Sequence, residues 1–209
     1  MKPGPLVHER GNLKGQLIVF EGLDQSGKQT QAEAVHDHLR SRDTASHLLS
    51  FPDYTTPIGT ELRRALHGER EYAADLMQLL YVANRYEMRE RIQEWLSSGA
   101  AVVCDRYVAS SIAYGEAQGL DPTWLRDIQK HLPLPDLTVL LDIAPETAVH
   151  RKTSGRDRYE RDLALLSRVR ESYRRQAAAS GWLLIDGEQA PQTVTASVLN
   201  AIATRLALR

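Results

Sequence analysis

QLIVFEGLDQSGKQTQ, residues 16–31, joins a short apolar run to a glycine-containing loop and a helix-forming segment. The run QLIVF predicts a strand that is buried on both faces. The loop fits the pattern G-x-x-x-x-G-K, in which glycines allow a tight turn with inward N–H groups and the lysine adds a mobile positive charge. The N-terminus of the following helix favours an anion in the same place. The stretch therefore predicts a phosphate-binding loop. Its residues are Gly22, Leu23, Asp24, Gln25, Ser26, Gly27, Lys28, Gln29 and Thr30.

One position departs from this pattern. The residue after the lysine is ordinarily Ser or Thr, whose hydroxyl binds Mg²⁺, whereas this chain has Gln29. An amide oxygen can also ligate a hard cation, directly or through water, and Thr30 offers a hydroxyl next to it. We therefore keep Gln29 as a candidate metal ligand. An ordinary glycine turn that caps a helix is the alternative interpretation of the loop.

The alternation of strand and helix continues along the chain. Residues 46–50, 100–104, 137–141 and 182–185 predict four more short strands. Helical crossovers between strands imply βαβ units, and hence an α/β fold with a five-stranded parallel sheet and helices on both faces. The predicted helices are 28–41, 57–67, 73–97, 110–118, 123–131, 145–152, 160–180 and 193–208.

The length favours one domain. No repeat or internal linker divides the 209 residues, so we expect a single domain over 15–209 after a flexible N-terminal extension, 1–14.

The composition is that of an ordinary globular protein. With 26 basic and 27 acidic residues the net charge is -1, which gives no global field to hold a nucleic acid. The single cysteine, Cys104, cannot form an internal disulfide and fits a reducing cytoplasm. Because residues 1–16 lack an apolar core and no run reaches about 18 apolar residues, we expect neither secretion nor a membrane partner.

A second cluster, DRYVASSIAYG, covers residues 105–115. Asp105 follows a predicted buried strand, and ligands of open α/β sheets collect at the carboxyl ends of strands. Asp105 is therefore suited to a hydrated Mg²⁺ and Arg106 to a substrate phosphate. A surface salt bridge between the two residues is the alternative.

The predicted helix 73–97 combines an apolar face with basic residues. Its arginines, among them Arg85, lie off that face, and a solvated surface is the simplest interpretation of each. Tyr81 and Arg85 are four residues apart, so they share one side of the helix and could line a pocket together. The apolar face consists of Leu76, Leu79, Leu80, Ala83, Tyr86 and Met88.

Four landmarks in order, GLDQSGKQTQ (22–31), FPDYTTPIG (51–59), LLYVANRYE (79–87) and DRY (105–107), closely resemble the thymidylate kinase family. The resemblance covers about residues 16–205. It implies a P-loop NTPase-type fold with a lid, and transfer of the γ-phosphoryl group of ATP to dTMP, giving dTDP and ADP. It also implies ATP and Mg²⁺ as cofactors, and a homodimer paired through helices such as 73–97.

The resemblance assigns the acceptor site residue by residue. Asp24 lies near the sugar and phosphate of dTMP, and the Phe51, Pro52 and Tyr54 segment closes over it. Members of the family often bend sharply at this point, which favours a cis Phe51–Pro52 bond. Ser50 stands where the family frequently has an arginine, so this chain lacks one phosphate contact of its relatives.

The base and the phosphate of dTMP are assigned in the same way. Tyr81 stacks on thymine and Arg85 donates to the base oxygen, while Arg106 holds the phosphate and Asp105 the metal or its waters. Ordinary core packing is the alternative for the tyrosines. The residues expected to face the base and deoxyribose are Ser110, Ser111 and Tyr114, of which Tyr114 disfavours a ribose 2′-hydroxyl.

The predicted lid, 152–162, begins a strongly basic stretch. Residues 151–175 contain nine basic side chains against four acidic ones. Family members carry a catalytic arginine either in the phosphate loop, where this chain has Gln25, or in the lid, so the resemblance implies the lid. Arg156, Arg158 and Arg161 are the candidates to reach ATP. A solvated charged helix is the alternative for several of these side chains.

Three other functions stay open from the sequence. The nearest is another nucleoside monophosphate or deoxynucleoside kinase on the same scaffold. Gln29 and Ser50 leave room for a nucleotide-binding module with weakened catalysis. An RNA- or DNA-binding regulator fits least, because few aromatic residues accompany the basic stretch.

Overall fold

The computed structural model describes residues 15–151 and 162–206. The predicted extension 1–14 lies outside these ranges, as does the predicted lid apart from Asp162. Arg156, Arg158 and Arg161 are therefore not described, and the division into an extension and one domain stays a prediction.

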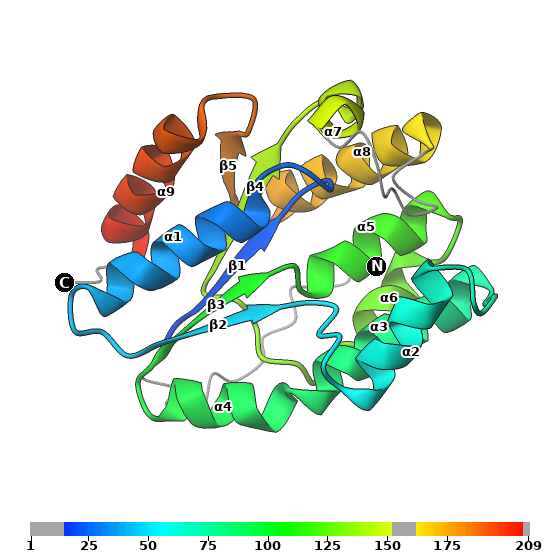
Figure 1. Cartoon of the computed structure of the whole chain (residues 1–209), viewed down its shortest axis with the longest axis horizontal. Coiled ribbons are helices and arrows are strands. Elements are labelled where there is room, and N and C mark those ends of the chain that lie inside the picture. Colours follow the sequence, from blue (N-terminus) through cyan, green and yellow to red (C-terminus); the bar gives the residue numbers. More distant parts are fainter. Residues whose placement is uncertain (1–14, 152–161, 207–209) are drawn as a thin grey trace, which may run out of the picture.

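A five-stranded parallel sheet forms the centre of the molecule, as the sequence predicts (Figure 1). Its order is β2-β3-β1-β4-β5. The chain leaves central strand β1 toward β2 and β3 on one side and later returns to β4 on the other, which creates a crevice at the carboxyl end of β1. The strands are β1 (Leu17–Glu21), β2 (Ser46–Ser50), β3 (Ala101–Asp105), β4 (Leu137–Asp142) and β5 (Leu183–Asp186).

Helices cover both faces of the sheet. On one face, α1 and α9 pack on side chains such as Ile18 and Phe20 (Figure 1). On the other face, α4 packs on Leu17 and Val19, and α5 and α8 pack on Leu140 of β4. Burying each large apolar side chain contributes about 1.5–3 kcal/mol. The helices are α1 (Lys28–Arg40), α2 (Pro57–Leu66), α3 (Ala74–Glu87), α4 (Arg89–Ser97), α5 (Val108–Ala117), α6 (Pro122–Asp127), α7 (Pro145–Arg151), α8 (Leu163–Ser180) and α9 (Pro191–Leu206). Within the described ranges, none of them is both long and apolar enough to cross a membrane.

The prediction of one helix over 73–97 is wrong. The segment forms two helices, α3 and α4, that meet at Met88. The Met88 N–H bonds to the Arg85 carbonyl, three residues back, and the backbone there has φ -99° and ψ -4°. This tight turn redirects the chain, so that Ile92 and Leu96 of α4 pack against the sheet while α3 lies beside α2 and α5.

The predicted apolar face is wrong in part, because Leu80 and Tyr86 pack against buried clusters but Leu76 and Leu79 do not. Leu76 and Leu79 are each 42% exposed, and the buried face includes Gln78, Asn84 and Arg85. Asn84 explains part of this inversion, because its side chain accepts from the Asp53 N–H and donates to the Asp53 carbonyl and to Thr56. The polar side of α3 therefore holds the loop that follows β2.

The contacts of Asn84 predict that its substitution destabilises the fold. We expect Asn84→Ala to lower the free energy of unfolding by about 1–3 kcal/mol, because the partly buried backbone groups of Asp53 lose their partners. Chemical denaturation measures the change. Asn200→Ala, at an exposed position of α9, is the matched control and should change it by less than about 0.5 kcal/mol. Equal effects of the two substitutions would contradict this role of Asn84.

Candidate active site

The loop between β1 and α1 is shaped for an anion. Its backbone has positive φ at Gly22 (144°), Gln25 (63°) and Gly27 (92°). A Cβ atom at Gly22 would lie 2.5 Å from the Leu141 carbonyl oxygen, so only glycine fits against β4 there. In the described chain no side chain caps the first N–H groups of α1, and the buried Ser26 Oγ has no hydrogen-bond partner. These donors suit a bound phosphate.

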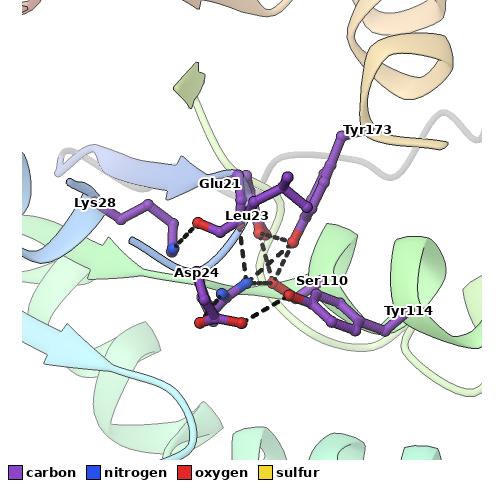
Figure 2. A network of polar contacts seen from close by, with 9 residues as sticks. Glu21, Leu23, Asp24, Lys28, Ser110, Tyr114 and Tyr173 are labelled. Carbon is purple, nitrogen blue, oxygen red and sulfur yellow. Dashed lines mark hydrogen bonds and ion pairs between the residues drawn. The ribbon is translucent and has the colours of Figure 1, made fainter. Parts of the chain in front are cut away.

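Lys28 is buried beneath this loop. Its Nζ donates to the Leu23 carbonyl at 2.8 Å (Figure 2). Burial and, to a smaller extent, the neighbouring Arg106 lower the pKa of this lysine to about 8, against the opposing effect of Asp105 and Asp24. Because this pKa lies close to neutral pH, the charge of Lys28 responds to the other charged groups in the site.

Arg106 projects from the end of β3 toward the same loop. Its Nη2 donates to Asp24 Oδ1 at 2.6 Å and its Nη1 to the Gly22 carbonyl at 3.1 Å. The Tyr114 ring lies 5.5 Å from the guanidinium, and its hydroxyl donates to Asp24 Oδ2 at 2.9 Å (Figure 2). Burial alone would raise the pKa of the Asp24 carboxyl, but Arg106 and Lys28 together hold that pKa well below its usual range. Both members of the pair are therefore charged.

A fully buried carboxylate, Glu21, lies behind Arg106. It accepts hydrogen bonds from the Tyr107 N–H at 2.9 Å, from the Ser110 hydroxyl at 2.7 Å and from the Tyr173 hydroxyl at 3.1 Å (Figure 2). Sequence reasoning missed both Glu21 and Tyr173. An acid at the end of an otherwise apolar strand was a usable signal for Glu21, whereas nothing in the sequence separates Tyr173 from other helical tyrosines.

A cavity of about 230 Å³ opens beside Arg106 at the carboxyl ends of β1, β2 and β3. Every residue predicted for the acceptor site lines this cavity, and the Phe51–Pro52 bond is cis as expected. Ser110 differs from its prediction in one respect, because its hydroxyl bonds to Glu21. The lining residues are Asp24, Ser50, Phe51, Pro52, Tyr54, Leu66, Gln78, Tyr81, Arg85, Asp105, Arg106, Ser110, Ser111 and Tyr114.

Arg85 lines this cavity from α3. It is 2% exposed, and its Nη2 donates to the Ser111 hydroxyl and, at 2.9 Å, to Gln129 Oε1. The solvated-surface interpretation of Arg85 is therefore wrong. Burial lowers the pKa of Arg85 against the opposing effect of the Glu21 carboxylate, and the result of about 10 keeps the guanidinium charged near neutral pH. Gln129 and the buried Gln78 were not predicted, since periodicity does not distinguish a pocket wall from a core.

The two candidate metal ligands are placed differently. Asp105 Oδ1 is buried, and no partner for it lies in the described part of the chain. A carboxylate oxygen without a donor fits a hard cation such as Mg²⁺. Gln29 is exposed, and its Nε2 donates to Glu33 Oε1 at 2.9 Å. Its amide oxygen is the atom that can face a cation.

The loop and the cavity meet at Asp24 and Arg106, so the site offers two phosphate-binding ends in one cleft. Buried cations at such a junction stabilise the charge of a migrating phosphoryl group. The fold and the site define a phosphotransferase of the P-loop class.

Comparison with known proteins gives the family. Residues 20–198 match the family model described as thymidylate kinase. The chain is 37% identical to thymidylate kinase of Schizosaccharomyces pombe over 78% of this chain and 77% of that one. It is 34% identical to the enzyme of Dictyostelium discoideum over 84% and 79%. The solved thymidylate kinase of Candida albicans superposes with a TM-score of 0.80 at 31% identity, covering 93% of this chain and 94% of that one. The chain belongs to the thymidylate kinase family.

The lowered pKa of Lys28 predicts a pH-dependent affinity for nucleotide. Below pH 8 the amine is charged and favours a phosphate, and above it the charge is lost, so we expect the Kd for ATP to rise toward tenfold per pH unit. Phosphate itself has finished ionising by then, since its second pKa is about 6. Titration calorimetry between pH 7 and 9.5 measures this. Lys28→Arg stays charged throughout and should give a flat profile. A flat profile for the unmodified protein would contradict the assignment.

Proposed function

We propose that the cavity beside Arg106 is the dTMP site and that residues 22–30 hold the phosphates of ATP. The chain is a dTMP kinase: it transfers the γ-phosphoryl group of ATP to dTMP and releases dTDP and ADP. The position of Arg106 supports this placement of the two nucleotides most directly. Its guanidinium contacts the phosphate loop and also lines the cavity.

The acceptor is held at three points in this proposal. Arg106 binds the dTMP phosphate, since a guanidinium matches two phosphate oxygens. Tyr81 stacks on thymine, and Arg85 donates to a base oxygen from a place where Ser111 and Gln129 fix its direction. Tyr114 lies against the sugar, where its bulk opposes a 2′-hydroxyl. Phe51, Pro52 and Tyr54, from the segment that follows β2, line the same cavity.

The donor is held by the loop. Backbone N–H groups of residues 22–30 cradle the phosphates, and Lys28 exchanges its bond to the Leu23 carbonyl for a phosphate oxygen. Asp105 would hold Mg²⁺, with the Gln29 amide oxygen as a further ligand. When bound, this ion would neutralise charge on the phosphates. Arg156 and Arg158 stay predictions as the catalytic arginines, because they lie outside the described residues.

The reaction needs positioning more than covalent chemistry. A dTMP phosphate oxygen attacks the γ-phosphorus in line, a new P–O bond forms, and the bond from the γ-phosphorus to the β-γ bridging oxygen breaks to release ADP. No general base is required, because the attacking phosphate is already ionised. Lys28 balances charge on the migrating group while Arg106 fixes the acceptor.

Two further features belong to the same proposal. The exposed leucines Leu76 and Leu79 suit α3 to a homodimer interface. A cytoplasmic location is supported by Cys104, which is buried and unpaired.

Loss of the Lys28 charge tests the activity. We expect Lys28→Ala to lower turnover with ATP and dTMP by roughly 10²- to 10³-fold, the usual effect of removing one charge-stabilising donor. Coupled detection of ADP measures it across a panel in which dTMP should exceed dCMP, GMP and thymidine as acceptor. Lys130→Ala, at an exposed lysine, is the control and should keep full activity. Full turnover by Lys28→Ala, or another acceptor preferred to dTMP, would contradict the proposal.

The exposed leucines of α3 predict the oligomeric state. We expect the unmodified chain to have twice its chain mass by light scattering, and the combined Leu76→Glu and Leu79→Glu variant to be a monomer. Leu184→Glu places the same charge at another exposed leucine, on β5, and should leave the dimer intact. A dimer that survives the double substitution would rule out this face.

A further inference from the structure

We propose that the Tyr173 hydroxyl is a positioning group that fixes the Arg106 guanidinium for the acceptor phosphate. The inference rests on the proposed role of Arg106. It assigns to α8, through one hydroxyl group, a part in binding that its sequence does not suggest.

The hydroxyl lies where three groups of the site meet. Arg106 Nη1 donates to it at 3.2 Å, the Ser110 hydroxyl lies 2.8 Å away, and Glu21 Oε2 accepts from it at 3.1 Å. Glu21 ends β1, and Arg106 and Ser110 belong to the segment from β3 into α5. Tyr173 comes from α8, so its hydroxyl links a separate element to this network (Figure 2).

Arg106 needs an anchor other than Asp24. Its Nη2 donates to Asp24. An entering phosphate would compete with Asp24 for this same Nη2 atom. Its Nη1 is held from the protein side by the Gly22 carbonyl, Ser110 and Tyr173. Its backbone is also in the left-handed region, at φ 64°, a costly conformation for a residue other than glycine that persists only where the surrounding structure holds it. Anchoring Nη1 keeps the plane of the guanidinium fixed while Nη2 changes partner.

The hydroxyl is held by a rigid helix. Arg170 of α8 forms a two-point ion pair with Asp142 at 2.7 and 2.9 Å, and Arg168 donates to the Ala117 carbonyl at 3.0 Å. The Tyr173 ring is itself 1% exposed and packs in the core between α5 and α8. Ring and hydroxyl therefore have separable roles, because phenylalanine keeps the packing and loses only the polar group.

The experiment compares dTMP with thymidine, which lacks the phosphate. We expect Tyr173→Phe to weaken dTMP binding in titration calorimetry by roughly 3- to 10-fold, the usual range for one lost hydrogen bond, and thymidine binding by less than about twofold. The KM for dTMP should rise by the same factor while the KM for ATP stays constant. Tyr86→Phe, whose lost hydroxyl donates to the Ile128 carbonyl, is the matched control and should change neither ligand.

A second variant gives an independent measure. Ser110→Ala should show the same selectivity for the phosphate, and its effect should be less than additive with Tyr173→Phe, because both hydroxyls contact the same Nη1. Equal weakening of dTMP and thymidine by Tyr173→Phe, or no weakening, would overturn the inference. An unmodified protein that binds dTMP no better than thymidine would instead overturn the role of Arg106 itself.

Discussion

The ion pair between Arg106 and Asp24 joins the ends of the two central strands on which the site is built. Asp24 belongs to the loop after β1 and Arg106 follows β3, and their 2.6 Å contact brings the loop and the cavity together. The pair is partly buried, so both charges are desolvated and their mutual attraction is strong. The Asp24 carboxylate binds the Arg106 guanidinium in the described structure. An incoming phosphate must therefore compete with this carboxylate for the same guanidinium.

The buried charges around this pair are tolerated because each has partners. Glu21 lies at the N-terminus of α5 and accepts three hydrogen bonds there, an arrangement that the helix dipole also favours. Breaking such a network by removing one member typically costs several kcal/mol, since a charge is left unpaired. The buried polar side of α3 is stabilised in the same way, because Arg85 Nη2 donates to Gln129 Oε1 and Asn84 Nδ2 donates to the Asp53 carbonyl.

Much of this arrangement could be predicted from the sequence. Each strand is a short apolar run between longer helical segments, and GLDQSGKQTQ and DRY have the residue types that phosphate binding requires. The break at Met88 could not be predicted, because a turn of this kind changes one hydrogen bond and leaves the helical pattern intact. The buried face of α3 was predicted wrongly in part, for a related reason. Apolar periodicity assumes that water lies opposite the core, whereas here the side opposite the exposed leucines faces a pocket.

A structure of the complex with dTMP and a non-hydrolysable ATP analogue would show whether one cleft holds both nucleotides with Arg106 between them. Arg106 should lie within about 3 Å of a dTMP phosphate oxygen while Nη1 keeps its contacts. An acceptor oxygen should lie about 3–3.5 Å from the γ-phosphorus. A dTMP phosphate bound away from Arg106, with the Asp24 ion pair unchanged, would contradict this arrangement.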